Sequence, residues 1–482
     1  MKKPILAIIL LALLLCGCGN SVKEAPLANN TPVITEVPAS PQPTQAPTAT
    51  PTIAPTEAPT PEPTDTPTPE PTAEPAVVAT DAPAHAPDME PNTTDSSFSD
   101  AETSTMDDWY QHMLNTSILS VGTNGRLEKF IDKLEKDEPV SIVAFGGSIT
   151  EGAGAENFTY SYGDQFINSL LEKYPLTGST YHNSGLGGTP STLGLMRYER
   201  DVTDILGNAP DLVIIEFAVN DYQEPTDGRA YESLVRTILE RDEDTAVILL
   251  FSVFESKWNL QADYIPIGEH YGLPMVSIKD AIATAYAGGH LTDAEYFADI
   301  YHPTNYGHEI MADCLTELFD RVAAKDTPAI MPLPETSVYG TDFMNMQLIT
   351  SQDSAGATVT TGSFTGQDKS LQTFARTAQA GFPDNWMHTF EGGNESLKIE
   401  LTCKNILLSY KFSNASDFGK ASVYIDDNLV TELSGYVNGG WNNTETVLIL
   451  DEDTASPHTL EIKMSEGQED KKFSVLGIGY TQ

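Results

Sequence analysis

The sequence predicts an α/β fold followed by a second domain made of β-strands. Between about residues 105 and 328, short runs of β-branched and apolar residues alternate with stretches of helical periodicity. Several of these runs end in glycines or in polar residues of the kind found in ligand sites. Beyond residue 334 the helical pattern gives way to short alternating segments, which are typical of antiparallel sheets.

The expected strands of the first region are residues 140–146, 179–185, 211–218, 245–253 and 274–278. The expected helices are residues 126–136, 160–173, 191–207, 228–243 and 304–323. Strands that alternate with helices in this way predict a parallel sheet covered by helices on both faces. The pattern alone does not choose among the doubly wound sheets.

Three of the expected strands lead to residues suited to catalysis. The first runs into Gly146 and Gly147, which let the chain turn sharply before Ser148. The second is followed by a glycine-rich segment that contains Gly188, and the third ends near Asn220. Because the carboxyl ends of parallel strands meet at one edge of a sheet, we expect a hydroxyl, a free amide and a carboxamide side chain there.

About 150 residues after Ser148, Asp299 and His302 supply a carboxylate and an imidazole. A hydroxyl needs a base of this kind to become a nucleophile near neutral pH. The spacing of the two residues places both side chains in one turn just before Pro303, where a helix can begin. There the carboxylate is expected to select the tautomer of the imidazole and to stabilise its cation.

The ordered set Ser148, Gly188, Asn220 and His302 resembles the SGNH (GDSL-like) hydrolases. This resemblance implies a three-layer αβα sandwich, flavodoxin-like with a parallel sheet, and the hydrolysis of esters. It implies Ser148 as the nucleophile, His302 as the general base, and Asp299 as the residue that orients the base. The implied oxyanion hole consists of the amides of Ser148 and Gly188 and the side chain of Asn220.

One block departs from the family pattern, because Ala218 stands where the family usually has glycine in Gly-x-Asn-Asp. We expect its methyl group to tighten the pocket without removing a reacting group. His308 is interpreted as a helix-packing residue and not as a second base. No HxxxH or CxxC pair occurs in the catalytic region, so neither a metal nor another cofactor is expected.

The N-terminal residues are expected to export the protein and to anchor it. Lysines precede an apolar run at residues 5–15, which has the length of a secretory signal core and is too short for a membrane span. Residues 1–18 resemble a bacterial lipoprotein signal whose Cys18 becomes lipidated; an ordinary signal peptide with incidental cysteines is the alternative. Residues 19–104, rich in Pro and Thr, then form an extended linker at the cell surface.

The formal net charge of −43 argues against binding of nucleic acid and against charge-driven adhesion to anionic lipid headgroups. The expected membrane contact is therefore the lipid anchor alone. Outside the export segment only Cys314 and Cys403 remain, and two buried thiols are favoured over a disulfide between them. The composition does not predict an oligomeric state.

Residues 335–482 are predicted to form a β-sandwich domain. The Asp-Asp-Asn run at residues 426–428 separates two apolar pairs and predicts a hairpin turn. The phrases VYIDD and KFSVLGIGY resemble the jelly-roll module that accompanies the SGNH domain in some carbohydrate esterases. Three aromatic residues are candidates for stacking on sugar rings, although core packing is favoured for each: Trp386, Tyr436 and Trp441.

These features together predict an exported, lipid-anchored serine esterase. Its expected substrate is an O-acylated carbohydrate, and an O-acetylated one is favoured. Two alternatives stay open: a lipase-like esterase or acyltransferase that uses the same site, and a catalytically silent carbohydrate-binding protein. The silent protein is disfavoured because all four reacting residues are retained: Ser148, Asn220, Asp299 and His302. A chain that ends near Pro334 is expected to keep its rate on a small ester and to lose activity on a polysaccharide.

Overall fold

The computed structural model describes residues 106–324, 330–391 and 393–482. The predicted signal peptide, Cys18 and the whole of the predicted linker lie outside these residues. The described residues belong to one compact unit, which contains both the α/β region and the C-terminal strands. None of the helices in this part of the chain is long and apolar enough to cross a bilayer.

A six-stranded sheet with the order β1-β6-β5-β4-β2-β3 forms the centre of the α/β region. Its strands are β1 (Ile118–Val121), β2 (Ser141–Gly146), β3 (Thr180–Gly185), β4 (Leu212–Glu216), β5 (Ala246–Phe251) and β6 (Pro274–Ser277). Strands β2 to β6 pair in parallel, which confirms the predicted sheet. Strand β1 was not predicted, because its four half-buried residues show no alternation; it pairs with β6 in the antiparallel direction.

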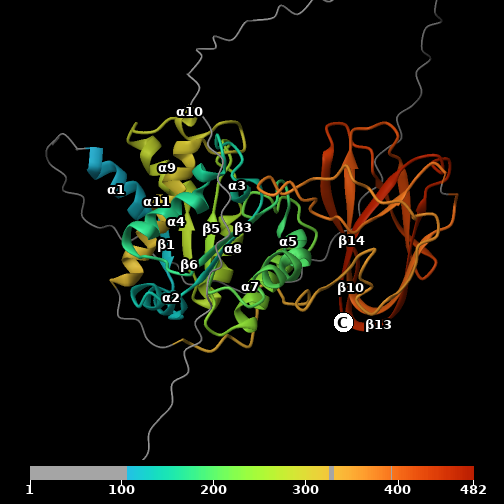
Figure 1. Cartoon of the computed structure of the whole chain (residues 1–482), viewed down its shortest axis with the longest axis horizontal. Coiled ribbons are helices and arrows are strands. Elements are labelled where there is room, and N and C mark those ends of the chain that lie inside the picture. The colour runs from blue at the N-terminus through green and yellow to red at the C-terminus, as the bar shows by residue number, and fades with distance from the viewer. Residues whose placement is uncertain (1–105, 325–329, 392) are drawn as a thin grey trace, which may run out of the picture. The chain divides into compact units, whose positions relative to one another are not determined.

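Helices cover both faces of this sheet (Figure 1). One face packs against α1 (Met106–Ser117), α2 (Arg126–Glu135), α4 (Tyr162–Lys173), α9 (Ile278–Ala287) and α11 (Asn305–Ala323), and the other against α5 (Ser191–Tyr198), α7 (Arg229–Arg241) and α8 (Gln261–Tyr271). Strand side chains alternate between the faces: Ile142 and Ala144 join the first core, and Val143 and Phe145 join the second. The three-layer αβα arrangement is thereby confirmed.

The structure adds detail that the helical periodicity did not predict. The helix expected at residues 191–207 consists of α5, a π-helical turn (Glu199–Thr203) and α6 (Asp204–Leu206). Helix α8 was missed because Pro266 interrupts its pattern. The remaining short helical turns are α3 (Ser148–Glu151), a 3₁₀ turn (Phe158–Tyr160) and α10 (Asp293–Tyr296).

The C-terminal region is an antiparallel β-sandwich, as predicted, with the strand order β12-β11-β13-β10-β14-β7. Its strands are β7 (Gln347–Ile349), β8 (Thr358–Thr360), β9 (Trp386–His388), β10 (Leu397–Ser413), β11 (Lys420–Ile425), β12 (Asn428–Ser434), β13 (Trp441–Met464) and β14 (Phe473–Thr481). A bulge after Cys403 divides β10, whose first half pairs with β8 and whose second half pairs with β14. The predicted hairpin turn joins β11 to β12, with φ of 49° at Asp426 and 65° at Asp427.

One layer of the sandwich is buried on both of its faces. Leu408 and Tyr410 of β10 point into the core of the sandwich. Leu407 of the same strand and Leu476 of β14 point the other way and join the core formed by α5, α7 and the central sheet. The α/β region and the sandwich therefore share a hydrophobic core.

Polar contacts fix the same junction. The fully buried carboxylate of Glu232 in α7 accepts the amides of residues 338–340 at 2.6–3.0 Å. One turn earlier, Arg229 pairs with Asp451 of β13 at 2.6 Å. Because a buried carboxylate is stable only when its oxygens are bonded, these contacts hold the chain in a defined path between the two regions.

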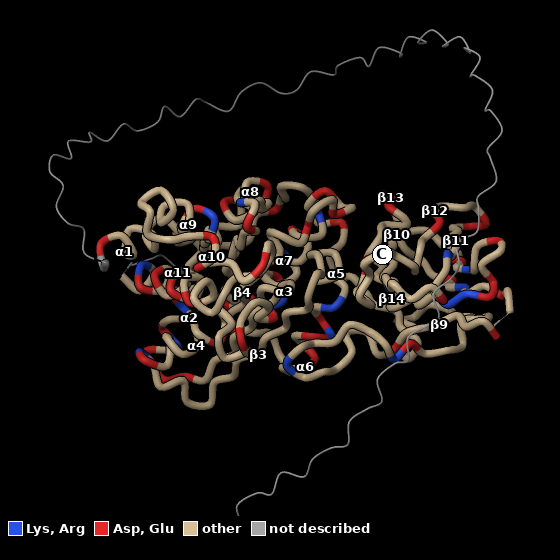
Figure 2. Tube along the Cα trace, turned by 90° about the horizontal axis from the view of Figure 1, so that it is seen from above, with Lys and Arg blue, Asp and Glu red and all other residues tan. Residues whose placement is uncertain are grey.

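The acidic surplus of the sequence is distributed over the described chain. Figure 2 shows Asp and Glu in both regions, with fewer Lys and Arg interspersed among them. Some of the cations pair with acidic side chains, as Lys133 does with Asp211 at 2.6 Å and Lys472 with Asp417 at 2.8 Å. This distribution agrees with the negative formal net charge of the sequence.

The shared core changes what is expected of a chain that ends at Pro334. Such a chain loses Leu407 and Leu476, and each large apolar side chain removed from a core costs about 2–5 kcal/mol. We therefore expect it to unfold at a lower temperature than the full chain and to lose rate on a small ester too. Thermal unfolding followed by circular dichroism, together with turnover of a chromogenic acetate, tests this. Equal stability and equal rates would show that the sandwich gives no support to the α/β region.

Candidate active site

Ser148 opens the short helix α3 directly after strand β2. A Cβ atom on the preceding residue, Gly147, would lie 2.2 Å from the side-chain oxygen of Asn220. Only glycine allows the ends of β2 and β4 to approach so closely. Ser148 itself is half-buried, so its hydroxyl group is held by the turn and still accessible.

The imidazole of His302 joins Ser148 to Asp299. Its Nε2 lies 2.9 Å from Oγ of Ser148, and its Nδ1 lies 2.9 Å from the nearer carboxylate oxygen of Asp299. With Nδ1–H donating to the carboxylate, Nε2 is free to accept the proton of the serine hydroxyl. This arrangement can activate Ser148 as a nucleophile.

Asp299 is held in its charged form. Burial acts to raise its pKa, but the hydrogen bond from His302 and the amides of Tyr301 and His302 outweigh it, so the pKa lies below its usual range. The two amides donate to the same carboxylate oxygen at 2.7 and 2.9 Å. The carboxylate therefore stays ionised in weak acid and can stabilise a cationic imidazole.

The two remaining predicted residues lie beside Ser148. Gly188 is exposed and has a φ of 63°, a left-handed conformation that favours glycine. A Cβ atom on its neighbour Gly187 would lie 3.7 Å from Cβ of Ser148. The side-chain oxygen of Asn220 is buried and has no hydrogen-bond partner among the described residues. Amide donors at these positions can meet negative charge that develops on an ester carbonyl oxygen.

Two residues near the site have packing roles. His308 is fully buried; its Nδ1 accepts the amide of Tyr162 at 3.3 Å, and its Nε2 lies 3.1 Å from the carbonyl of Ala153. Burial lowers the pKa of His308 to about 4, so the ring is neutral near pH 7. Its interpretation as a packing residue is confirmed. Ala218 is buried in the core beside α7, where its methyl group packs.

Cys314 and Cys403 are both buried and free, which confirms the prediction of two separate thiols. Burial raises the pKa of each thiol to about 12, so neither is a thiolate near neutral pH. Within residues 106–324, 330–391 and 393–482, no group of three or more His, Cys, Asp or Glu has the arrangement of a metal site.

Two buried carboxylates lie beneath the site. Glu216, the last residue of β4, accepts hydrogen bonds from Thr150 at 2.9 Å and from Ser252. Asp221 accepts the amide of Ser191 at 2.6 Å, at the start of α5. Burial raises the pKa of each carboxyl group to about 7. Sequence reasoning missed both, because an acidic residue at a strand end looks like an ordinary solvated one.

A row of aromatic rings extends from His302. Ring centroids lie 6.1 Å apart between His302 and Tyr301, 5.1 Å between Tyr301 and Phe254, 5.9 Å between Phe254 and Trp258, and 5.6 Å between Trp258 and Tyr222. Tyr301 and Tyr222 are 49% and 68% exposed. These four residues, Tyr301, Phe254, Trp258 and Tyr222, are called the aromatic row below.

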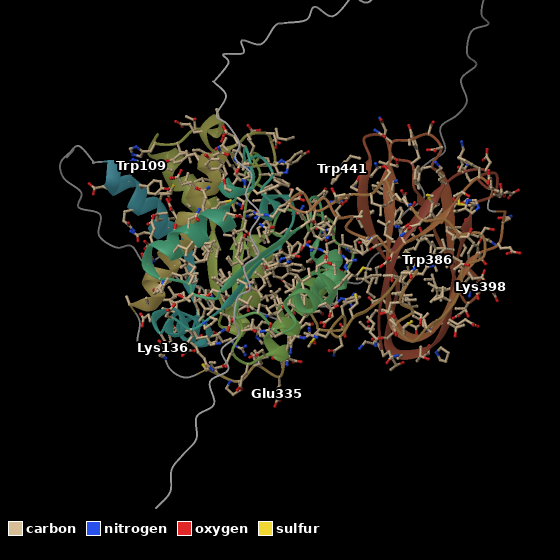
Figure 3. The ribbon with its side chains drawn as sticks, in the orientation of Figure 1. Trp109, Lys136, Glu335, Trp386, Lys398 and Trp441 are labelled. Carbon is tan, nitrogen blue, oxygen red and sulfur yellow. The ribbon has the colours of Figure 1, made fainter. Side chains whose placement is uncertain are left out.

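The sandwich contributes a further aromatic ring to the site. A Cβ atom on Gly188 would lie 3.3 Å from Cζ2 of Trp441, and Trp441 is 55% exposed (Figure 3). Tyr436 is also exposed, whereas Trp386 is buried in the core of the sandwich. Core packing, which was favoured for all three aromatic residues, is therefore confirmed for Trp386 and wrong for Tyr436 and Trp441. The ring of Trp441 lies at the site.

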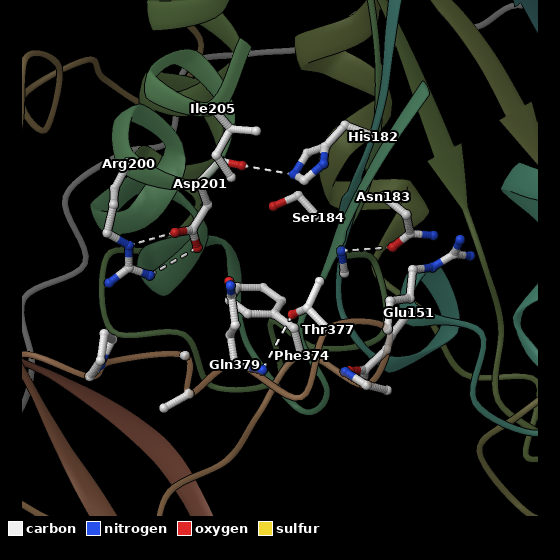
Figure 4. Close-up of a pocket in the computed structure, with 16 residues that line it drawn as sticks. Glu151, His182, Asn183, Ser184, Arg200, Asp201, Ile205, Phe374, Thr377 and Gln379 are labelled. Carbon is white, nitrogen blue, oxygen red and sulfur yellow. Dashed lines mark hydrogen bonds and ion pairs between the residues drawn. The ribbon is translucent and has the colours of Figure 1, made fainter. Parts of the chain in front are cut away.

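A pocket of about 470 Å³ lies next to α3, between strand β3 and residues 374–383 (Figure 4). Glu151, His182 and Arg200 are among the residues that line it, but neither Ser148 nor His302 does. The reacting groups described above therefore lie outside this pocket.

Comparison with known proteins identifies the α/β region. Residues 144–310 match the GDSL-like Lipase/Acylhydrolase family. The chain carries a GDSL-like hydrolase domain. Two crystal structures of a two-domain esterase (CEX) active on acetylated mannans, one co-crystallized with mannopentaose, resemble this chain with a TM-score of 0.66 each. Their sequences are 25% and 26% identical to this one. Each alignment covers 77% of this chain, and the two alignments cover 98% and 99% of the respective esterase chains. No curated protein matches the chain.

The GDSL-like domain makes the chain an SGNH-type ester hydrolase, as the sequence predicted. The structure brings Ser148, His302, Asp299, Gly188 and Asn220 to one place, the edge of the sheet where β2, β3 and β4 end. Gly187 and Gly188 are called the glycine loop below. Glu151 and Gln372 both lie close to Gly187, and sequence reasoning did not find these contacts because no local pattern marks them.

Replacement of Glu216 in the hydrolase domain by glutamine is expected to flatten the dependence of stability on pH. The folded-state pKa is about 7 and the usual value is 4.5. Between these values the folded protein binds a proton that the unfolded chain has lost, so this group's contribution to stability falls as pH rises from about 4.5 to 7. The contribution of this group to the free energy of unfolding is at most about 3 kcal/mol.

Calorimetric melting temperatures between pH 5 and 8 test this expectation for Glu216→Gln. The variant should lose less stability than the parent as pH rises. Glu240→Gln is the matched control, because Glu240 is exposed on the surface of α7. Parallel curves for the parent and Glu216→Gln would contradict the expectation.

Proposed function

We propose that the protein is an exported, lipid-anchored serine esterase that removes O-acetyl groups from a polysaccharide. The observation that carries the proposal is the contact of 2.9 Å between Nε2 of His302 and Oγ of Ser148, with Asp299 at the other imidazole nitrogen. Only a base placed in this way makes a serine hydroxyl a useful nucleophile near neutral pH.

In the proposed reaction, Ser148 attacks the acetyl carbonyl carbon while His302 takes the hydroxyl proton and Asp299 stabilises the resulting cation. The amides of Ser148 and Gly188 and the side chain of Asn220 bind the oxyanion, and a donor of this kind is worth about 3–4 kcal/mol. His302 then protonates the sugar oxygen, which leaves, and the acetyl group remains on Ser148. A water molecule, deprotonated by His302, releases acetate and restores the serine.

Aromatic surface near the reacting groups supports a carbohydrate substrate. Sugar rings have apolar faces that pack on aromatic rings, and the aromatic row and Trp441 offer such rings near His302 and Gly188. The similar two-domain esterase is active on acetylated mannans, so acetylated mannan is the first polymer to test. Faster turnover of long-chain esters than of acetates would instead favour the lipase-like alternative.

The N-terminal sequence supports export and anchoring. The apolar run at residues 5–15 and the cysteine at position 18 suit a lipoprotein signal. Within the Pro- and Thr-rich linker, residues 29–91 alone can extend to roughly 200 Å, which would carry the hydrolase domain away from the membrane. A polymer outside the cell is then within reach of a tethered enzyme.

Substitution Cys18→Ser is expected to release the protein from the membrane fraction of a bacterial expression host, because it removes the sulfur that accepts the lipid. Fractionation followed by immunoblotting measures this, and Cys16→Ser is the matched control. An equal membrane fraction for Cys18→Ser and the parent would argue for an ordinary signal peptide.

Substitution Ser148→Ala is expected to abolish acetate release from a chromogenic ester and from acetylated mannan. The melting temperature should stay near that of the parent, because no buried cavity results. A serine-directed phosphonate should label the parent and not the variant, while Ser169→Ala on helix α4 should behave like the parent. Undiminished turnover by Ser148→Ala would refute the assignment of the nucleophile.

Substitution Trp441→Ala is expected to lower kcat/KM on acetylated mannan about 2- to 10-fold, as for loss of one aromatic contact. The change on a small chromogenic acetate should be smaller, because that substrate does not reach the ring. Tyr436→Ala, an exposed aromatic change elsewhere in the sandwich, is the control. An equal loss on both substrates would mean that Trp441 supports the loop of Gly188 and does not bind sugar.

A further inference from the structure

The carbonyl group of Gly187 is held by a residue from the C-terminal region. Nε2 of Gln372 donates a hydrogen bond to the oxygen of Gly187, and Oε1 of Gln372 accepts the amide of Thr444 at 3.3 Å. The oxygen end of the carboxamide thus faces a donor and the nitrogen end faces an acceptor, which defines its orientation. The side chain of Gln372 is buried, with 7% of its surface exposed.

This hydrogen bond also sets the direction of the next amide. Gly187 and Gly188 share one planar peptide unit, in which the carbonyl of Gly187 and the N–H of Gly188 point in opposite directions. Gln372 therefore directs the N–H of Gly188 away from itself. Neither glycine has a side chain that packing can hold, so the orientation of this peptide depends on bonds made to its polar groups.

A second residue contacts the glycines from the side of the serine. The carboxylate of Glu151 accepts the amide of Ala375 at 2.7 Å, and a Cβ atom on Gly187 would lie 3.1 Å from its Oε2. Glu151 is the last residue of α3, the helix that Ser148 begins (Figure 4). The glycine loop, the serine helix and residues 372–376 are therefore connected through one carboxylate.

Residues 372–376 are themselves held on the α/β region. Arg376 donates to Asp164 at 3.1 Å and to Oγ of Ser161 at 2.9 Å, both at the start of α4. The amide of Gln372 donates to the carbonyl of Asn442 at 3.1 Å, in the strand that begins with Trp441. Gln372 is therefore held at its own amide, and Arg376 anchors the residues that follow it. A side-chain donor with a fixed position of this kind is suited to positioning a catalytic group.

We propose that Gln372 is a positioning residue of the oxyanion hole, which orients the peptide between Gly187 and Gly188 so that the amide of Gly188 meets the substrate oxyanion. The proposal rests on the proposed esterase function. It adds that the C-terminal region completes the active site, beyond any role in binding polymer. Its effect is on kcat, because the oxyanion exists only after attack on the ester.

Substitution Gln372→Glu tests the proposal with a small chromogenic acetate between pH 5 and 8. Glutamate keeps the size of the side chain, but at pH 8 it has no N–H and its charge repels the carbonyl of Gly187. We expect kcat at pH 8 to fall about 10- to 100-fold, less than for complete loss of an oxyanion donor, with little change in KM.

The pH profile separates positioning from a structural role. A protonated carboxyl group has an O–H that can donate to Gly187, so kcat of Gln372→Glu relative to the parent should rise again as pH falls. Dividing by the parent value at each pH removes any dependence on pH that both proteins share. A variant that is only destabilised has no reason to regain relative activity in acid.

Three further variants complete the experiment. Gln367→Glu is the matched control, because Gln367 is exposed and donates to the carbonyl of Pro383 at 2.7 Å; it should keep the parent kcat. Asn220→Ala, expected to cost about 100- to 1000-fold, calibrates the loss of a donor. Gln372→Met has neither donor nor charge and should show a loss that does not depend on pH, which keeps the test valid if the glutamate variant does not fold.

If the parent is active and both Gln372→Glu and Gln372→Met keep its kcat, the proposed role of Gln372 is overturned. The esterase function would remain intact in that case. A loss in Gln372→Glu that is the same at every pH and is accompanied by a lower melting temperature would also overturn it. A parent that releases no acetate from any ester would refute the proposed function itself.

Discussion

The structure depends on the burial of both faces of the strand layer formed by β10, β13 and β14. Adjacent residues of β10 serve two cores, since Leu408 packs inside the sandwich and Leu407 packs against the α/β region. A sandwich joined only through a flexible linker has no fixed position, and it cannot hold a side chain within hydrogen-bond distance of a catalytic loop. The shared core removes that freedom, so Gln372 and Trp441 come to defined places beside Gly187 and Gly188.

The predicted reacting groups are placed by rigid elements at one edge of the sheet. Ser148 follows β2 and Asn220 follows β4, so their separation is set by the pairing of these strands. Below them, Glu216 and Asp221 bond to hydroxyl and amide groups that hold the neighbouring turns. Buried carboxyl groups of this kind destabilise the folded state when they ionise, so these two residues lower the stability of the hydrolase domain next to its site as pH rises.

Much of the α/β region could be predicted from local patterns. The strands β2 to β6 are short, apolar and bounded by turn residues, which is why they were recognised. Strand β1 and helices α1, α8 and α9 were missed. Strand β1 is half-buried throughout, and Pro266 lies inside α8. The turn at Asp426 and Asp427 was recognised because residues with positive φ have a narrow side-chain preference.

The sequence by itself determined the candidate residues of the site, because the serine, histidine and aspartate are each marked by residue type and by position after a strand or before a helix. It also determined that a strand-rich domain follows. Only the tertiary structure decided that this domain shares a core with the hydrolase and reaches its glycine loop. Gln372 and Gly187 are 185 residues apart, and a contact over that separation leaves no periodic signal. It depends on which faces of two folded sheets are buried against each other, a property of packing that no local pattern encodes.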